Sequence, residues 1–145
     1  MAIKTYKAFA EKIEGLKVKA TARDFSIILD EPENQGGNNE GMNPVELALC
    51  SLSACQTITA IIFADFYGIP LEDIKIEAVG EMDSDGFSNP NVRTGFQKIS
   101  FKFHIKSSAS KFQIEELVKI VEKMCPVGDS LKNNVILEKP EIILE

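Results

Sequence analysis

The feature that most constrains the fold of this chain is an uncharged run of 18 residues at positions 47–64. Asn43 is a good N-cap just upstream, Pro44 fits the first helical position, and Glu46 completes a capping box with Asn43. Gly68, followed closely by a proline, is typical of a helix end. The sequence therefore predicts one long helix that begins at Pro44 and ends just before Gly68.

The composition of this helix bears on whether it crosses a membrane or fills a core. A run of this length is close to the lower limit for a membrane span. It nevertheless carries serine, threonine and glutamine side chains, and no cationic flank follows it. We therefore expect a central core helix, apolar on all sides and wrapped by sheet.

The segments around this helix show mostly strand-like patterns. Strands are expected at residues 3–9, 13–22 and 24–30 before the helix, and at residues 72–81 and 96–106 after it. Apolar and polar residues alternate along the last two segments, so these segments would form a hairpin whose inner face covers the central helix. That inner face consists of apolar side chains, namely Ile74, Ile76, Ala78, Phe101, Phe103 and Ile105.

A second, amphipathic helix is expected to begin near Ser110, where Ser110 and Gln113 offer another capping box. Its apolar stripe continues to Cys125. A short turn and a last strand at residues 134–145 follow, and Pro140 places that strand at a sheet edge. The predicted fold class is α+β, in the order β-β-β-α-β-β-α-β, as a single domain over residues 1–145.

Composition and charge limit the partners and cofactors that this chain is expected to use. The 145 residues carry 16 basic and 22 acidic side chains, a net charge of −6, which argues against nucleic acid and anionic membrane surfaces. The first residues lack the pattern of a signal peptide, so a cytoplasmic location is expected. One histidine and scattered cysteines do not make a metal site, and no cofactor-binding motif is present, so neither is expected.

Two of the three cysteines are candidates for chemistry. Cys55 lies in the central helix, where it could be a small buried hydrophobe, and Cys125 ends the stripe of the second helix. The two thiols could meet if the helices pack, since a disulfide needs Cα atoms within about 4.4–6.8 Å. Cys50 points about 140° away from Cys55 around the helix axis and is interpreted as core filler.

A catalytic thiol needs a nearby cation to hold it as the thiolate. Arg93 lies in a polar loop and is most simply a solvated charge. Arg23 follows a strand, and alternation places it on a polar face that is solvent-exposed in a monomer but could face a partner subunit. His104 lies on the exposed face of its strand, so it is not expected to act as a base or a ligand.

Several segments of this chain resemble the OsmC/Ohr family of thiol peroxidases. The run GGNNEGMNPVELALCSLSACQTITA is similar to that family's Gly-rich loop, Asn-Pro helix start and first cysteine, twelve residues after the Asn. The tetrapeptide CPVG resembles its second cysteine followed by proline, and TARDFSI resembles the segment that carries its arginine. Together with FYGIPLEDIKIEAVGEMD, the likeness covers nearly the whole chain in one order.

The resemblance implies an intertwined homodimer whose sheets enclose long central helices, with two sites at the subunit interface. It implies that Cys55 is the peroxidatic thiol, Cys125 the resolving thiol and Arg23 the activating cation. It also implies a hydroperoxide substrate, often an organic one, and an external dithiol reductant, which is of the lipoyl type for part of the family.

One position departs from the family pattern. The well-described peroxidases have a glutamate directly after the helix-start proline, where it holds the arginine, whereas this chain has Val45 there and Glu46 next. Glu46 lies on the opposite side of the helix from Cys55, so it is better explained as a capping residue. Two alternatives therefore stand beside the peroxidase: a non-catalytic dimeric protein that binds a small hydrophobic ligand, and a thiol redox sensor.

Overall fold

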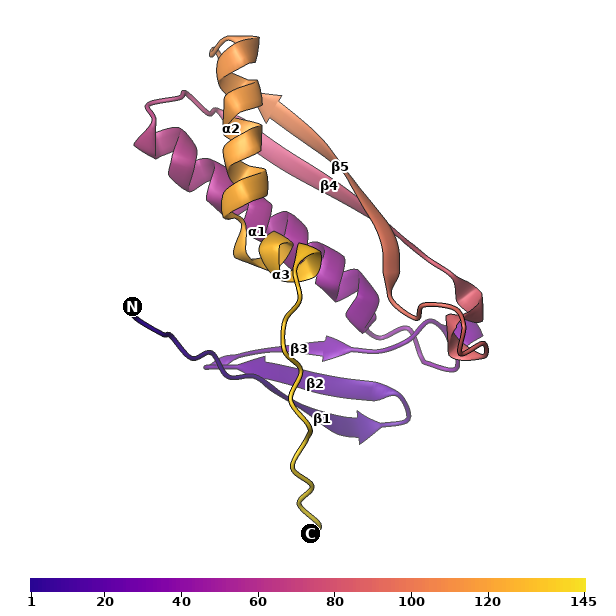
Figure 1. Ribbon diagram of the computed structural model, residues 1–145. Helices are drawn as coiled ribbons and strands as arrows, with labels where there is room; N and C mark the ends of the chain where they lie inside the picture. Colours follow the sequence, from indigo (N-terminus) through magenta and orange to yellow (C-terminus); the bar gives the residue numbers. More distant parts are fainter. The chain divides into compact units, whose positions relative to one another are not determined.

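The computed structural model describes all 145 residues and divides them into two compact units, Met1–Leu49 and Cys50–Glu145. Both units combine antiparallel strands with helix, as the predicted α+β class requires (Figure 1). The expectation of a single domain over the whole chain stays a prediction.

The N-terminal unit is a three-stranded antiparallel sheet, formed by β1 (Phe9–Glu14), β2 (Lys17–Ala22) and β3 (Phe25–Leu29) in that order. The second and third strands lie within the predicted segments, but the prediction of a first strand at residues 3–9 was wrong. Gly15, with φ +52°, turns the chain directly after β1. Because β2 is six residues long, the tight turn pairs it with the six residues just before the turn.

A Gly-rich loop follows β3 and includes a 3₁₀ turn, η1 (Glu33–Gln35). The carboxylate of Asp30 organises it by accepting backbone N–H groups of Glu31, Asn38 and Glu40 at 2.8–3.2 Å. Asp30 is only 2% exposed, so these bonds replace the water that the carboxylate loses on burial. A Cβ at Gly37 would lie 1.9 Å from the carbonyl oxygen of Glu31, so no other residue fits there.

The long helix α1 (Pro44–Phe66) begins as predicted. Asn43 Oδ1 accepts the N–H of Glu46, and Glu46 Oε2 accepts the N–H of Asn43, which closes the capping box. Gly68, with φ +64°, follows its end. By length and mean hydropathy (1.9) α1 could cross a membrane, but the core helix of a soluble protein has the same properties.

The C-terminal unit contains the hairpin of β4 (Asp73–Met82) and β5 (Phe96–Lys106), with a 3₁₀ turn, η2 (Ser84–Phe87), between them. Its register pairs Ile74 with Ile105, Ile76 with Phe103, and Ala78 with Phe101, which confirms the predicted apolar face. The hairpin runs along α1, and α2 (Lys111–Met124) starts at the predicted Ser110–Gln113 capping box (Figure 1).

After α2 the structure departs from the predicted order. Instead of a turn and a strand, a short helix α3 (Pro126–Lys132) follows, because Cys125 acts as its N-cap and Pro126 fits its first position. Residues 133–145 form no strand, so the observed order is β-β-β-α-β-β-α-α. Within the C-terminal unit this tail pairs with neither β4 nor β5, and its apolar side chains are exposed: Val135, Ile136, Leu137, Ile142, Ile143 and Leu144.

The prediction that α1 is wrapped on all sides is also wrong for the single chain. Its buried side chains lie on one side of the helix: Leu52, Gln56, Thr59, Ala60 and Ala64. The other side exposes large apolar side chains, including Ile58, Ile61, Ile62 and Phe66. Cys50 is exposed as well, so the interpretation as core filler is wrong: no element of the C-terminal unit covers it.

Candidate active site

The structure brings Cys55 and Cys125 together within the C-terminal unit. Cys55 is half-buried in the middle of α1, and Cys125 lies at the junction of α2 and α3, 1% exposed. Cys125 Sγ accepts the backbone N–H of Gly128 at 3.4 Å, which fixes the thiol at the start of α3. The Cys55 side chain is the other close neighbour of this thiol.

The environment of Cys125 opposes its ionisation. Burial raises the pKa of the Cys125 thiol, and the neighbouring Cys55 raises it further as a hydrogen-bond partner and through its charge. The N–H of Gly128 lowers the pKa of Cys125, because it stabilises the thiolate. The net effect is still a raised pKa. Cys125 is therefore a protonated thiol at neutral pH, held against its partner.

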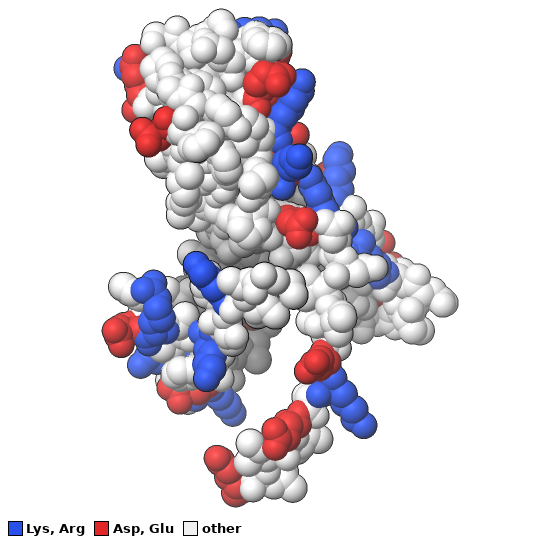
Figure 2. Space-filling view, turned by 60° about the vertical axis from the view of Figure 1, so that its left-hand side comes forward, with Lys and Arg blue, Asp and Glu red and all other residues white.

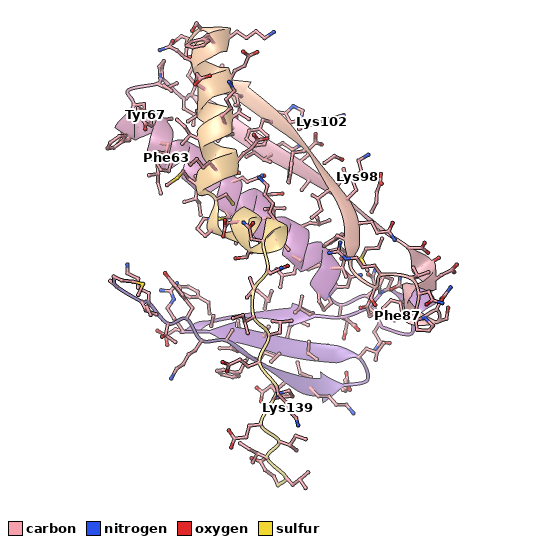
Figure 3. All side chains as sticks on the ribbon, in the orientation of Figure 1. Phe63, Tyr67, Phe87, Lys98, Lys102 and Lys139 are labelled. Atoms are coloured by element: carbon pink, nitrogen blue, oxygen red, sulfur yellow. The ribbon has the colours of Figure 1, made fainter.

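A cavity of about 480 Å³ lies beside Cys55, and we call it the Cys55 cavity. Its walls come from α1 and from the α2–α3 junction, and none of its lining side chains is cationic. The residues that line it are mostly apolar: Ser51, Ala54, Cys55, Ile58, Thr59, Ile62, Phe63, Met124, Pro126 and Val127. Phe63 also stacks on Tyr67 near the end of α1, with ring centroids 6.3 Å apart (Figure 3).

A second cavity, of about 500 Å³, lies beside Cys125, and we call it the Cys125 cavity. Leu52 and Gln56 of α1, the first half of β5, and residues of α2 and α3 line it. Arg93 and Lys132 bring positive charge to its wall, and Glu122 is its one acidic residue. Lys98 is also at its edge, but its side chain projects away from the helices, as Lys102 does (Figure 3).

Gln56 is a buried polar residue in the wall of the Cys125 cavity, and part of its side chain lacks a hydrogen-bond partner. The residue is 3% exposed, and its Oε1 has no hydrogen-bond donor. A buried acceptor without a partner costs about 1–3 kcal/mol of stability. The residue therefore destabilises the packing around Cys125.

Arg23 lies in the N-terminal unit, in the turn between β2 and β3. Its backbone is left-handed, with φ +55°, and its guanidinium carbon lies 5.0 Å from the ring centroid of Phe25. The prediction that it continues the alternation of the strand was wrong, because the chain leaves the extended conformation at this residue. Its role as the activating cation stays a prediction.

Glu46 and His104 lie where the sequence placed them. Glu46 is occupied by the capping box of α1. His104 is exposed on β5 and lies 2.6 Å from a carboxylate oxygen of Glu77, to which it forms a surface ion pair when protonated.

Sequence reasoning missed the polar residues of the Cys125 cavity. Arg93 is exposed, as expected of a solvated charge, but its place in a cavity wall was not predicted, and neither Lys132 nor Gln56 was considered as part of a site. These residues come from a loop, from α3 and from α1, so no local motif connects them. Only the packing of β5 against the helices brings them to one wall.

A pair of neighbouring thiols held between two helices defines this chain as a dithiol protein of the α+β class. Residues 36–138 match the model of the family described as OsmC-like protein. The chain belongs to this family.

The relatives and solved structures carry related descriptions. The chain is 27% identical to a hydroperoxide reductase of Mycoplasma genitalium over 131 residues, 88% of this chain and 87% of that protein. It is 26% identical to the hydroperoxide reductase of Mycoplasma pneumoniae, covering 89% and 88% of the two chains. Its fold matches the crystal structure of an OsmC-like protein from Mycoplasma pneumoniae with a TM-score of 0.79, 25% identity and coverage of 89% and 88%.

Proposed function

We propose that this protein is a cysteine-based peroxidase that reduces organic hydroperoxides. The observation that carries the proposal is the pair of neighbouring thiols, Cys55 half-buried beside an apolar cavity and Cys125 buried beside it. The hydroperoxide reductases to which the chain is similar support the same reaction.

In the proposed mechanism the Cys55 thiolate attacks the distal oxygen of the hydroperoxide. The O–O bond breaks, the alkoxide takes a proton and leaves as an alcohol, and Cys55 becomes a sulfenic acid. Cys125 then attacks the Cys55 sulfur, and water leaves as the disulfide forms. An external dithiol returns two electrons and two protons to the pair. A reducing cytoplasm would supply such dithiols.

The Cys55 cavity favours an organic substrate over hydrogen peroxide. Its walls are aliphatic and aromatic, and apart from the thiol they carry only hydroxyl groups, from Ser51 and Thr59. An alkyl group gains about 25 cal/mol for each Å² of apolar surface that it buries there. The peroxide group itself would then lie against Cys55, the one nucleophile of the cavity.

The same cavity lacks the cation that a thiolate needs, and this favours a contribution from outside its walls. We assign that cation to Arg23 and propose that the protein acts as a homodimer. The exposed apolar side of α1 and the apolar tail at residues 133–145 support association with a second copy. Figure 2 shows a broad face of the C-terminal unit almost free of charged side chains.

The proposal is tested by peroxide consumption with a dithiol reductant, using cumene hydroperoxide as substrate. Cys55→Ser should abolish the consumption. Cys50→Ser is the matched control, because Cys50 is an exposed thiol on the same helix, and it should keep the wild-type rate. A wild-type rate no higher than that of Cys55→Ser would contradict the enzyme proposal.

The cavities also support the alternative of a protein that binds a small hydrophobic ligand, with no catalysis. Alkylation of Cys55 as a function of pH, in a Cys125→Ser background, separates the two. An activated thiol should react as the thiolate well below pH 8.5, whereas an ordinary thiol pKa near 8.5 would favour the binding protein.

A further inference from the structure

The two cysteines of the candidate site line different cavities. Cys55 lines the Cys55 cavity and not the Cys125 cavity, whereas Cys125 lines the Cys125 cavity and not the other. A disulfide between them would therefore present one sulfur to each cavity. We propose that the reducing dithiol enters the Cys125 cavity and attacks Cys125 Sγ, while the hydroperoxide reaches Cys55 from the other side. This inference rests on the dithiol cycle of the proposed function.

The direction of approach supports this assignment. A thiolate attacks a disulfide sulfur along the S–S axis, from the side opposite to the leaving sulfur. Attack on Cys125 therefore has to come from the side away from Cys55. The Cys125 cavity meets that condition, because Cys125 is in its wall and Cys55 is not.

The choice of leaving group also favours attack on Cys125. Cys55 is the more exposed of the two residues, so access alone would favour attack there. Such an attack would expel Cys125, whose buried position raises its pKa and makes it the poorer leaving group. Attack on Cys125 expels Cys55 instead, and returns it directly to the thiolate that the next peroxide requires.

The step balances as an ordinary thiol–disulfide exchange. A thiolate of the dithiol forms a bond to Cys125 Sγ, the bond between the two protein sulfurs breaks, and its electron pair goes to Cys55. The second thiol of the reductant loses its proton and attacks the reductant's own bound sulfur. Cys125 leaves, takes a proton, and the reductant departs as a cyclic disulfide.

The attacked sulfur can be identified without any peroxide. The disulfide is formed in the wild-type protein with diamide, treated briefly with the monothiol 2-mercaptoethanesulfonate, and quenched with an alkylating reagent. Peptide masses should then show the monothiol on Cys125 and the alkyl group on Cys55. The reverse pattern, or the absence of a Cys55–Cys125 disulfide, would overturn the inference.

Two substitutions test the separate entrances. A Cβ at Gly128 would lie 3.5 Å from Cys125 Sγ and 3.7 Å from Leu52 Cδ1, so Gly128→Ala fits without displacing its neighbours but shields the sulfur. It should slow reduction of the diamide-formed disulfide by about threefold or more, and leave single-turnover oxidation by cumene hydroperoxide at its wild-type rate. Ala54→Leu narrows the Cys55 cavity. It should slow single-turnover oxidation by cumene hydroperoxide and leave reduction of the diamide-formed disulfide at its wild-type rate. Equal slowing of both half-reactions by either variant would overturn separate entrances.

A protein that shows the expected trapping but does not consume hydroperoxide would disprove the peroxidase and leave this inference standing.

Discussion

The two cysteines of the candidate site differ in burial, in hydrogen bonding and in the cavity that each lines. Cys55 is half-buried in the middle of a helix, beside a cavity with no cation, whereas Cys125 is buried at a helix cap and accepts a backbone N–H. Cys55 lines an apolar cavity, whereas Cys125 lines a different cavity that also has charged residues in its wall. The roles of two neighbouring thiols are therefore set by their surroundings, because the side chains themselves are identical.

The largest expected effect comes from removing the resolving thiol. Wild-type protein treated with one equivalent of hydroperoxide should lose two hydrogens in intact mass, because the pair closes to a disulfide. Cys125→Ser should react once and then gain two oxygens as Cys55 over-oxidises to the sulfinic acid. A stable single-oxygen adduct in the wild type would mean that the two thiols never meet during turnover.

The next effect concerns the cation that the Cys55 cavity lacks. Arg23→Met should lower the fraction of Cys55 present as thiolate at neutral pH, and so reduce its alkylation rate about tenfold or more. Light scattering should show the same mass near 32 kDa, twice the 16.0 kDa of the chain, for both proteins. Unchanged alkylation kinetics, or a well-folded monomer, would remove the role given to Arg23.

A smaller effect is expected in the dependence of stability on pH. Burial raises the pKa of Cys125 in the folded protein, whereas the unfolded chain ionises this thiol near its ordinary value of about 8.5. The stabilisation is therefore complete below that value and is lost as the pH rises through the raised pKa of the folded state. Denaturant unfolding between pH 7 and 10 should show this loss in Cys50→Ser and a weaker one in the Cys50→Ser, Cys125→Ala double variant. If the free energy of unfolding fell equally with pH in both variants, the raised pKa assigned to Cys125 would be contradicted.

The smallest effect tests the wall of the Cys125 cavity. Gln56→Leu removes a buried oxygen that has no donor, so it should raise the free energy of unfolding, by about 1–3 kcal/mol. Gln97→Leu is the matched control on the same cavity, since Gln97 is exposed and should show little change. A loss of stability in Gln56→Leu would show that the amide has a partner in solution.

The elements that sequence predicted well are those with local physical signals. Both capping boxes, the course of α1 and the apolar face of the β4–β5 hairpin depend on residues within a few positions of one another. Local steric and hydrogen-bonding preferences act whatever the rest of the chain does, so they can be identified from the sequence.

The tertiary structure decided what depends on distant partners. The strand predicted at residues 134–145 failed because a strand needs a neighbour, and the sequence does not say which one is present. The prediction that Cys50 is buried failed because the C-terminal unit leaves one side of α1 uncovered. The meeting of Cys55 with Cys125, and of Arg93 with Lys132 on one cavity wall, required the packing of segments that lie far apart in the sequence. Sequence alone determined which residues could carry the chemistry, and only long-range packing determined which of them meet, because contact between distant segments is set by the whole core.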